Sequence, residues 1–148
     1  SGRMIAEALH GMGADVRYFS RTRKPDAEAA GLRFQPLDAL LAECEAVFTC
    51  LNKNVILLHE EQFARLGTHK ILFNTSIGPA ADLPALARWL DDPRNLFCCD
   101  TAGALGDPAL LERSNVLCVN TSAGRTKEAF GLLSEKVLAN LKAHLQGG

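Results

Sequence analysis

Short apolar runs that stop at small or polar residues recur along the chain. Six of them predict β-strands, because each is brief and is followed by a turn signal. They are Val16–Phe19, Leu32–Gln35, Ala46–Leu51, Lys70–Asn74, Leu96–Cys99 and Val116–Val119. In the fourth run, Ile71 to Phe73 give way to Asn74-Thr75-Ser76, and Gly78-Pro79 then breaks the strand. Ligands bind at such carboxyl ends of strands in open α/β sheets.

Segments with helical spacing separate these strands. They cover residues 3–10, 26–30, 37–44, 55–66, 80–90, 108–112 and 126–145, whereas Thr101–Gly106 predicts a Gly-rich loop. The last helix keeps apolar residues at a period near 3.6. Strands that alternate with helices predict an α/β fold, a doubly wound parallel sheet of Rossmann type. In such a sheet the apolar strand Ala46–Leu51 would be buried on both faces.

Charge and hydropathy limit the classes of binding partner that the sequence favours. The formal net charge of the 148 residues is −1, so nothing favours a polyanion and we expect no nucleic-acid binding. No apolar run approaches the roughly 18 residues of a membrane span. Ser1-Gly2-Arg3 is not followed by the apolar region of a signal peptide. We therefore expect a cytoplasmic protein without a membrane partner.

The five cysteines and four histidines show neither Cys-x-x-Cys pairs nor the spacing of metal ligands. Four of the cysteines lie in the apolar strands, which favours buried free thiols in a reducing compartment. No metal site is predicted.

A cofactor turn is indicated at the start of the chain. Dinucleotide folds open with a strand and a Gly-x-Gly-x-x-Gly turn into a helix, whose N-terminus binds the pyrophosphate. Only the last of these glycines can be present here, as Gly2. The following strand ends at Ser20, eighteen residues on, where the ribose-reading residue is expected.

The residues at that strand end favour NADP. NAD-specific sites place Asp or Glu there to accept from the ribose 2′-hydroxyl, but this chain has Ser20-Arg21-Thr22-Arg23-Lys24. An arginine fork fits a 2′-phosphate that a carboxylate would repel. We predict NADP binding through Ser20, Arg21 and Thr22, with NAD as a possible cofactor. The alternative is a solvated basic loop.

These motifs, with the last two turns, resemble the cofactor-binding domain of the D-isomer-specific 2-hydroxyacid dehydrogenases. Gly2-Arg3-Met4 is similar to the Gly-Arg-Ile of that family, and Asn74-Thr75-Ser76-Ile77-Gly78-Pro79 to its Asn-Thr-Ala-Arg-Gly-Pro. Asp100 matches the aspartate of Asp-Val-Phe. Asn115-Val116 and Ala123-Gly124-Arg125-Thr126 match the Asn-Val and Ala-Gly-x-Thr that follow. The resemblance covers nearly the whole chain.

The resemblance implies a set of cofactor-binding residues. Beyond those at the first two turns, they are Leu51, Asn52, Thr75, Ser76, Ile77, Asp100, Thr121, Ser122, Ala123 and Gly124. Asp100 would accept from the carboxamide of the nicotinamide, and the others would line the same ring or the loop over it. Alternatively, Asp100 caps the next turn and Ser122 is a simple turn residue.

The catalytic residues of the family are not matched. Ile77 stands where the family has the Arg that holds the substrate carboxylate, and Thr121 where it has the acid–base His. Asp107, before Pro108, is the nearest candidate for the Glu that orients that His. Ile77 forms no ion pair, and Thr121 does not exchange protons near pH 7. The catalytic residues are therefore unknown; Lys53 is either a proton donor or a solvated loop lysine.

Two functions follow from this pattern. The first is an NAD(P)-dependent oxidoreductase, NADP-preferring, that transfers hydride to or from a small carbonyl or hydroxy substrate that lacks the usual carboxylate. The second is a non-catalytic dinucleotide-binding or scaffold module derived from the same fold. The cofactor domains of the family form its dimer, so the resemblance also implies a homodimer.

The strand order raises a geometric question. In the order 3-2-1-4-5-6 the strand expected before Gly2 is central. Without it, Val16–Phe19 and Ala46–Leu51 would lie about 10 Å apart, two strand spacings. We therefore expect residues 1–148 to be a fragment of a longer chain, an NAD(P)-binding domain whose sheet lacks its first strand and whose substrate domain precedes Ser1.

Overall fold

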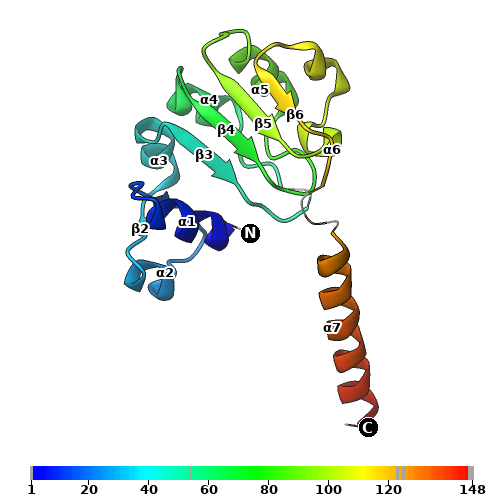
Figure 1. Ribbon diagram of the computed structural model, residues 1–148. Helices are drawn as coiled ribbons and strands as arrows, with labels where there is room; N and C mark the ends of the chain where they lie inside the picture. Colours follow the sequence, from blue (N-terminus) through cyan, green and yellow to red (C-terminus); the bar gives the residue numbers. More distant parts are fainter. Residues whose placement is uncertain (1, 54, 123, 125, 147–148) are drawn as a thin grey trace.

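The computed structural model describes residues 2–53, 55–122, 124 and 126–146. Parallel strands alternate with helices along the chain (Figure 1). The strands are β1 (Arg17–Tyr18), β2 (Arg33–Phe34), β3 (Ala46–Thr49), β4 (Ile71–Asn74), β5 (Leu96–Cys99) and β6 (Val116–Cys118). The helices are α1 (Gly2–Gly11), α2 (Pro25–Ala29), α3 (Leu37–Glu43), α4 (Glu60–Leu66), α5 (Leu83–Trp89), α6 (Ala102–Leu105), the 3₁₀ helix η1 (Pro108–Glu112) and α7 (Lys127–Gln146).

The strands form two sheets. One has the order β1-β2 and the other β3-β4-β5-β6, and every pair within them is parallel. Among the described residues, no ladder joins β1 to β3. The parallel strands confirm the predicted α/β fold of Rossmann type, and the expected break between β1 and β3 is present. We call residues 2–36 the N-terminal unit and residues 37–122 the four-stranded unit.

The core lies in the four-stranded unit, on one face of its sheet. Alternate strand residues Val47, Leu72, Phe97 and Val116 pack against buried side chains of α3, α4 and α5. The continuous core cluster extends from Leu40 to Leu110 and Val116. The chain steps from β3 to β6 in one direction, and right-handed crossovers put all its connecting helices on one face.

The opposite face of this sheet is open, so the prediction that Ala46–Leu51 is wholly buried is wrong. Ala46 is exposed and Phe48 half-buried, while Val47 and Thr49 are buried. On the same open face Phe48 and Phe73 stack with ring centroids 4.3 Å apart, and Leu117 is 54% exposed. Helix α1 precedes β1 and α2 connects β1 to β2, and neither covers this face of the four-stranded sheet (Figure 1).

Three helix predictions need correction. Residues 55–59 are not helical: Leu58 forms a parallel bridge with Ala81, and α4 begins only after His59, where the His59–Gln62 capping box stops the helix from extending backwards. Ala81 is held in the same bridge, so α5 starts at Leu83 rather than directly after Pro79. Part of the predicted Gly-rich loop is the helix α6, because the Thr101 side chain accepts from the Ala104 amide and caps it.

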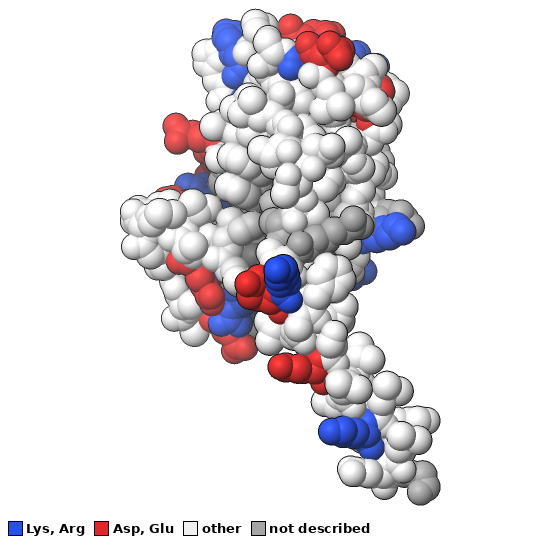
Figure 2. Space-filling view, turned by 45° about the vertical axis from the view of Figure 1, so that its right-hand side comes forward, with Lys and Arg blue, Asp and Glu red and all other residues white. Residues whose placement is uncertain are grey.

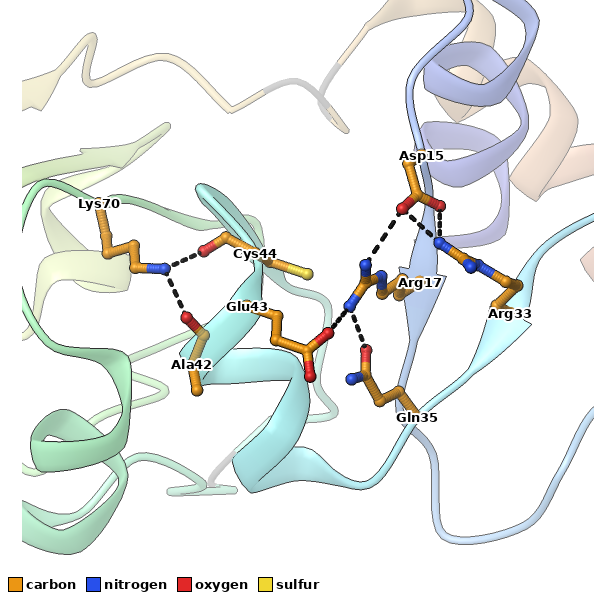
Figure 3. A network of polar contacts seen from close by, with 8 residues as sticks. All are labelled: Asp15, Arg17, Arg33, Gln35, Ala42, Glu43, Cys44 and Lys70. Atoms are coloured by element: carbon orange, nitrogen blue, oxygen red, sulfur yellow. Dashed lines mark hydrogen bonds and ion pairs between the residues drawn. The ribbon is translucent and has the colours of Figure 1, made fainter.

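Charged side chains join the N-terminal unit to α3 (Figure 3). Arg17 donates to Gln35 Oε1 at 3.1 Å and to Asp15 Oδ2 at 3.2 Å, and it also pairs with Glu43 at the end of α3. Arg33 pairs with Asp15. The arginines hold the pKa of Asp15 below its ordinary value, with Arg33 contributing most. The Arg17–Glu43 pair therefore links the N-terminal unit to α3 of the four-stranded unit.

Helix α7 extends away from the rest of the molecule (Figure 1). It contains no buried residue, and its apolar side chains, Phe130, Leu133, Val137 and Leu141 among them, are exposed. No helix within the described ranges is long and apolar enough to cross a membrane. In the view of Figure 2, acidic and basic side chains are intermixed, and no extended area of one sign is visible.

Candidate functional site

The candidate site lies at the edge of the four-stranded sheet where the carboxyl ends of its strands meet. Because β3, β4, β5 and β6 are parallel and in register, the turns that follow them lie side by side. The predicted cofactor residues from Leu51 to Thr121 occupy these turns. The first residue of α1 lies at the same edge.

The N-terminus of α1 packs directly on the end of β3. A Cβ added to Gly2 would lie 3.1 Å from Cys50 Cβ, which is tighter than ordinary contact, so only glycine allows this approach without displacement. Helix N-terminal amides attract anions, so the position suits a pyrophosphate. Arg3 donates to Glu7 at 2.7 Å on its own helix, and Met4 is 74% exposed.

The loop after β1 presents one cation without a partner among the described residues. Arg23 pairs with Glu28 and lies 5.3 Å from the Phe34 ring centroid. Ser20 donates to the Thr22 carbonyl at 2.5 Å, which closes the loop, and Arg21 is exposed without an ion pair in the described ranges. Arg21 is thus open to solvent in this loop, whereas the Ser20 hydroxyl is engaged within the protein.

The turns after β3 and β4 are bound to each other. The Leu51 amide donates to Ser76 Oγ at 2.8 Å, and Thr75 Oγ1 donates to the Thr49 carbonyl at 3.1 Å. Ser76 is buried, so its hydroxyl faces the protein rather than a ligand. Thr75, Ile77 and Asn52 are exposed, with Ile77 at 74%. Of this set, Thr75, Ile77 and Asn52 are therefore the residues open to solvent at the sheet edge.

The turns after β5 and β6 also meet. The Thr121 amide donates to the Asp100 carbonyl at 2.8 Å, and the Asp100 side chain is half-buried. Ser122 is half-buried and Gly124 exposed, while the predicted residue Ala123 lies outside the described residues. The structure thus brings Asp100 and Thr121 together, as the parallel register requires.

The candidates for proton transfer are placed less favourably. Asp107 Oδ1 accepts from the Ala109 amide at 2.9 Å and caps η1, so it is a structural cap. Lys53 is exposed. His59 belongs to the capping box of α4, and His144 lies in α7, away from the turns. Within the described ranges, no group of His, Cys, Asp and Glu residues is arranged to hold a metal ion.

The cysteines are free, and only Cys99 is buried. The other four are half-buried: Cys44 at the end of α3, Cys50 and Cys118 at strand ends, and Cys98 on the open sheet face. Burial, followed by contact with Cys118 on the next strand, raises the pKa of Cys99 to about 12. A thiol with so high a pKa is a poor nucleophile.

Asn74 is the residue that the sequence reasoning missed. It is 1% exposed and makes four hydrogen bonds at the end of β4. The available signal was a lone amide that closes the apolar run Ile71–Phe73 at a strand end, because a buried amide needs partners and finds them in neighbouring turns.

The motif residues match a known family. The sequence model of the "D-isomer specific 2-hydroxyacid dehydrogenase, NAD binding domain" matches residues 1–102. A glyoxylate reductase of Korarchaeum cryptofilum is 28% identical over 99% of this chain and 46% of its own length. A glyoxylate reductase of Thermococcus onnurineus is 34% identical over 60% of this chain and 28% of its own length.

Solved structures agree in fold. The D-lactate dehydrogenase of Lactobacillus jensenii with NAD⁺ has a TM-score of 0.80 and 25% identity, over 99% of this chain and 50% of its own. That of Aquifex aeolicus, complexed with NAD and lactic acid, has a TM-score of 0.81 and 19% identity over the same shares. The chain spans about half the length of these relatives. With the motif residues gathered at one sheet edge, the chain belongs to the D-isomer-specific 2-hydroxyacid dehydrogenase family, through its NAD-binding domain.

Proposed function

We propose that this chain is the cofactor-binding part of an NAD(P)-dependent oxidoreductase that acts on a CH–OH or carbonyl group and prefers NADP. The observation that carries the proposal is the packing of the α1 N-terminus on the end of β3, at the edge where the turns after β3 to β6 meet. Arg21 is exposed in the loop after β1. The bound nicotinamide would supply or accept hydride. Thr75, Ile77 and the Asp100–Thr121 pair would surround its ring, and Gly2 with the α1 amides would hold the pyrophosphate.

NADP preference rests on Arg21. Its side chain is exposed in the loop after β1, where the family reads the ribose, and residues 20–24 include no carboxylate to accept from a 2′-hydroxyl. Arg23, two residues on, is engaged with Glu28 and Phe34. The loop therefore offers a test residue and a matched control of the same type.

Titration calorimetry with NADPH and NADH tests this part of the proposal. Arg21→Ala should weaken NADPH binding by about 10- to 100-fold, the range of a lost charge-assisted hydrogen bond, and leave NADH binding nearly unchanged. Arg23→Ala should change both affinities alike. Equal losses of NADPH and NADH in Arg21→Ala would refute NADP preference, while the oxidoreductase assignment would remain.

The substrate is proposed to lack the carboxylate of 2-hydroxy acids. Ile77 is 74% exposed at the position where the family holds that carboxylate with an arginine, and an alkyl side chain offers no ion pair. We expect NADPH oxidation with aldehydes or ketones without an acid group, and little with glyoxylate. Ile77→Arg should raise the ratio of kcat/KM for glyoxylate to that for an uncharged aldehyde by about tenfold or more. An unchanged ratio contradicts the proposal.

A non-catalytic dinucleotide-binding module is the second candidate. It is favoured by the residue types at the site, because Thr121 stands where an imidazole is expected and Asp107 is used as a helix cap. The two functions differ in one measurement. Dinucleotide binding without turnover on any member of a carbonyl panel supports the module, and loss of binding as well leaves a scaffold.

Two proposals concern the whole protein. Within the described ranges β1 and β3 belong to separate sheets, which supports the proposal of a longer chain in which a further strand joins them and a substrate domain is present. A homodimer is supported by the exposed apolar residues Ile71 and Leu117 on the open sheet face. Light scattering of the intact protein tests the second: Leu117→Lys should shift a dimer toward monomer, and a wild-type monomer contradicts it.

A further inference from the structure

The buried amide of Asn74 has a partner at every polar position. Its Oδ1 accepts from Thr49 Oγ1 at 3.0 Å and from the Ser76 amide at 2.9 Å. Its Nδ2 donates to the carbonyls of Gly78 at 3.0 Å and Ala104 at 2.8 Å. The partners fix the orientation of the amide, because a backbone N–H can only donate and a carbonyl can only accept. An amide with no spare hydrogen-bonding capacity holds one geometry.

These partners belong to three different segments of the site. Thr49 ends β3, the Ser76–Gly78 turn follows β4, and Ala104 lies in α6, just after Asp100 at the end of β5. Ser76 adds a second link, because its hydroxyl accepts from the Leu51 amide at 2.8 Å and lies 3.3 Å from the Thr49 carbonyl. Asn74 and Ser76 therefore tie together the turns after β3, β4 and β5.

We propose that Asn74 and Ser76 are positioning residues, which hold these three turns in the geometry that the cofactor requires without contacting it. The proposal rests on the dinucleotide-binding function proposed above and reassigns Ser76, which the sequence placed among the cofactor contacts. Turns that are ordered before binding lose less conformational freedom when the ligand arrives. Loss of the links should therefore weaken binding although no ligand contact is removed.

A second buried amide provides the control. Asn115 donates to the carbonyls of Leu90 at 3.0 Å and Asn95 at 2.9 Å, and it is buried like Asn74. It precedes β6 and so lies at the amino ends of the strands, the edge opposite the site. If buried amides only stabilise the fold, loss of the links at Asn74 and at Asn115 should have the same effect on cofactor affinity.

Asn74 itself is a risky target, because truncating it leaves several buried groups unpaired. The tests therefore use Ser76→Ala and an isosteric pair at Thr49. Thr49→Val removes the hydroxyl that donates to Asn74 and keeps the shape, whereas Thr49→Ser keeps the hydroxyl and loses a methyl group. Asn115→Ala is the control. For each full-length variant we would measure NADPH and NADH affinity by calorimetry, melting temperature, and hydrogen exchange of residues 50–52 and 75–78.

Ser76→Ala and Thr49→Val should raise the Kd of both cofactors by about tenfold and speed exchange in the two turns. Thr49→Ser should restore the affinity, and Asn115→Ala should lower the melting temperature without changing the Kd. Wild-type affinity in Ser76→Ala and Thr49→Val would overturn the inference, as would a Kd increase of the same size in Asn115→Ala. If the wild type binds neither cofactor, the proposed function itself fails, an outcome distinct from variants that bind as well as the wild type.

Discussion

In the four-stranded unit, strands, α3, α4 and α5 share one continuous apolar core that includes Leu41, Leu72 and Leu86, each at most 1% exposed. In the N-terminal unit, only Ala27 and Leu32 are buried among the described residues, and α1 buries none. It is joined to the four-stranded unit by the close approach of Gly2 to Cys50 and by the Arg17–Glu43 ion pair. Asp15 and Arg33 extend that ion pair on the N-terminal side (Figure 3).

The difference separates a unit stabilised by an apolar core from a unit held largely by exposed ion pairs, and both units carry residues proposed to bind the cofactor. Apolar burial stabilises by about 25 cal/mol per Å², whereas exposed ion pairs contribute little and are screened by salt. The four-stranded unit should therefore set the global stability, and the N-terminal unit should open locally. The N-terminal unit carries Gly2 and Arg21, so local opening would reduce cofactor affinity without unfolding the core.

The largest contrast is expected between two leucines of the two units. Leu72→Ala, in the middle of the core, should lower the free energy of unfolding by about 2–5 kcal/mol, measured by denaturant titration of the fluorescence of Trp89, the single tryptophan. Leu32→Ala removes the same atoms at 4% exposure. It should leave the Trp89 transition nearly unchanged, because it loosens only the N-terminal unit. Equal losses would show one cooperative core and break the comparison.

The next effect tests the ionic boundary. Arg17→Met keeps the apolar stem and removes the contacts to Asp15, Gln35 and Glu43. Amides of residues 16–35 should then exchange about two- to fivefold faster, while the Trp89 transition stays in place. Arg88→Met is the control, because the Arg88–Glu60 pair joins two helices inside the four-stranded unit. Accelerated exchange of residues 16–35 in the control as well would show that the Arg17 contacts do not specifically hold the N-terminal unit.

Acid should uncouple the units in a fixed order. Hydrogen bonds from Arg33 and Arg17 lower the pKa of Asp15, and those from Gln35 and Arg17 lower the pKa of Glu43. Carboxyls with lowered folded pKa values stabilise above the ordinary value near 4 and lose this contribution as the pH falls through the folded value. Asp92 in the four-stranded unit, whose pKa Arg94 lowers to about 2, stays charged longer.

An acid titration with two intrinsic probes measures that order. The absorbance of Tyr18, the single tyrosine, should change at higher pH than the fluorescence of Trp89. Tyr18 also donates to Glu28 at 2.9 Å, so Glu28→Gln is needed to remove that local titration from the signal. Coincident transitions in this variant would mean that acid unfolds both units together.

The same comparison explains what the sequence could predict. Strand positions and the carboxyl-edge location of the site follow from local apolar runs. The residues around Leu51, Thr75 and Asp100 come from the resemblance to the family, and the parallel register places their turns at one sheet edge. The open sheet face was missed, because an apolar strand does not reveal which of its faces a helix covers. Residues 55–59 were assigned to a helix because the Leu58–Ala81 bridge pairs segments distant in sequence. The direction of the Ser76 hydroxyl also depends on a distant segment, because the Leu51 amide donates to it, and the local sequence around Ser76 does not show this contact.

The smallest expected effect comes from Lys70, which supports the boundary from the core side. Its Nζ donates to the carbonyls of Ala42 at 2.9 Å and Cys44 at 2.7 Å, and so caps the end of α3 that carries Glu43 (Figure 3). Lys70→Met should lower the Trp89-monitored stability by only about 0.3–1 kcal/mol, the size of a charge at a helix C-terminus.

The informative quantity is the coupling between Lys70 and Arg17. If Lys70 fixes the α3 end so that Glu43 meets Arg17, the double variant should accelerate exchange in residues 16–35 by less than the product of the two single effects. Two effects that multiply without loss would mean that Lys70 caps α3 and does nothing more. The contact between the two units would then depend on the arginine network alone, because Lys70 would not help to position Glu43 for Arg17.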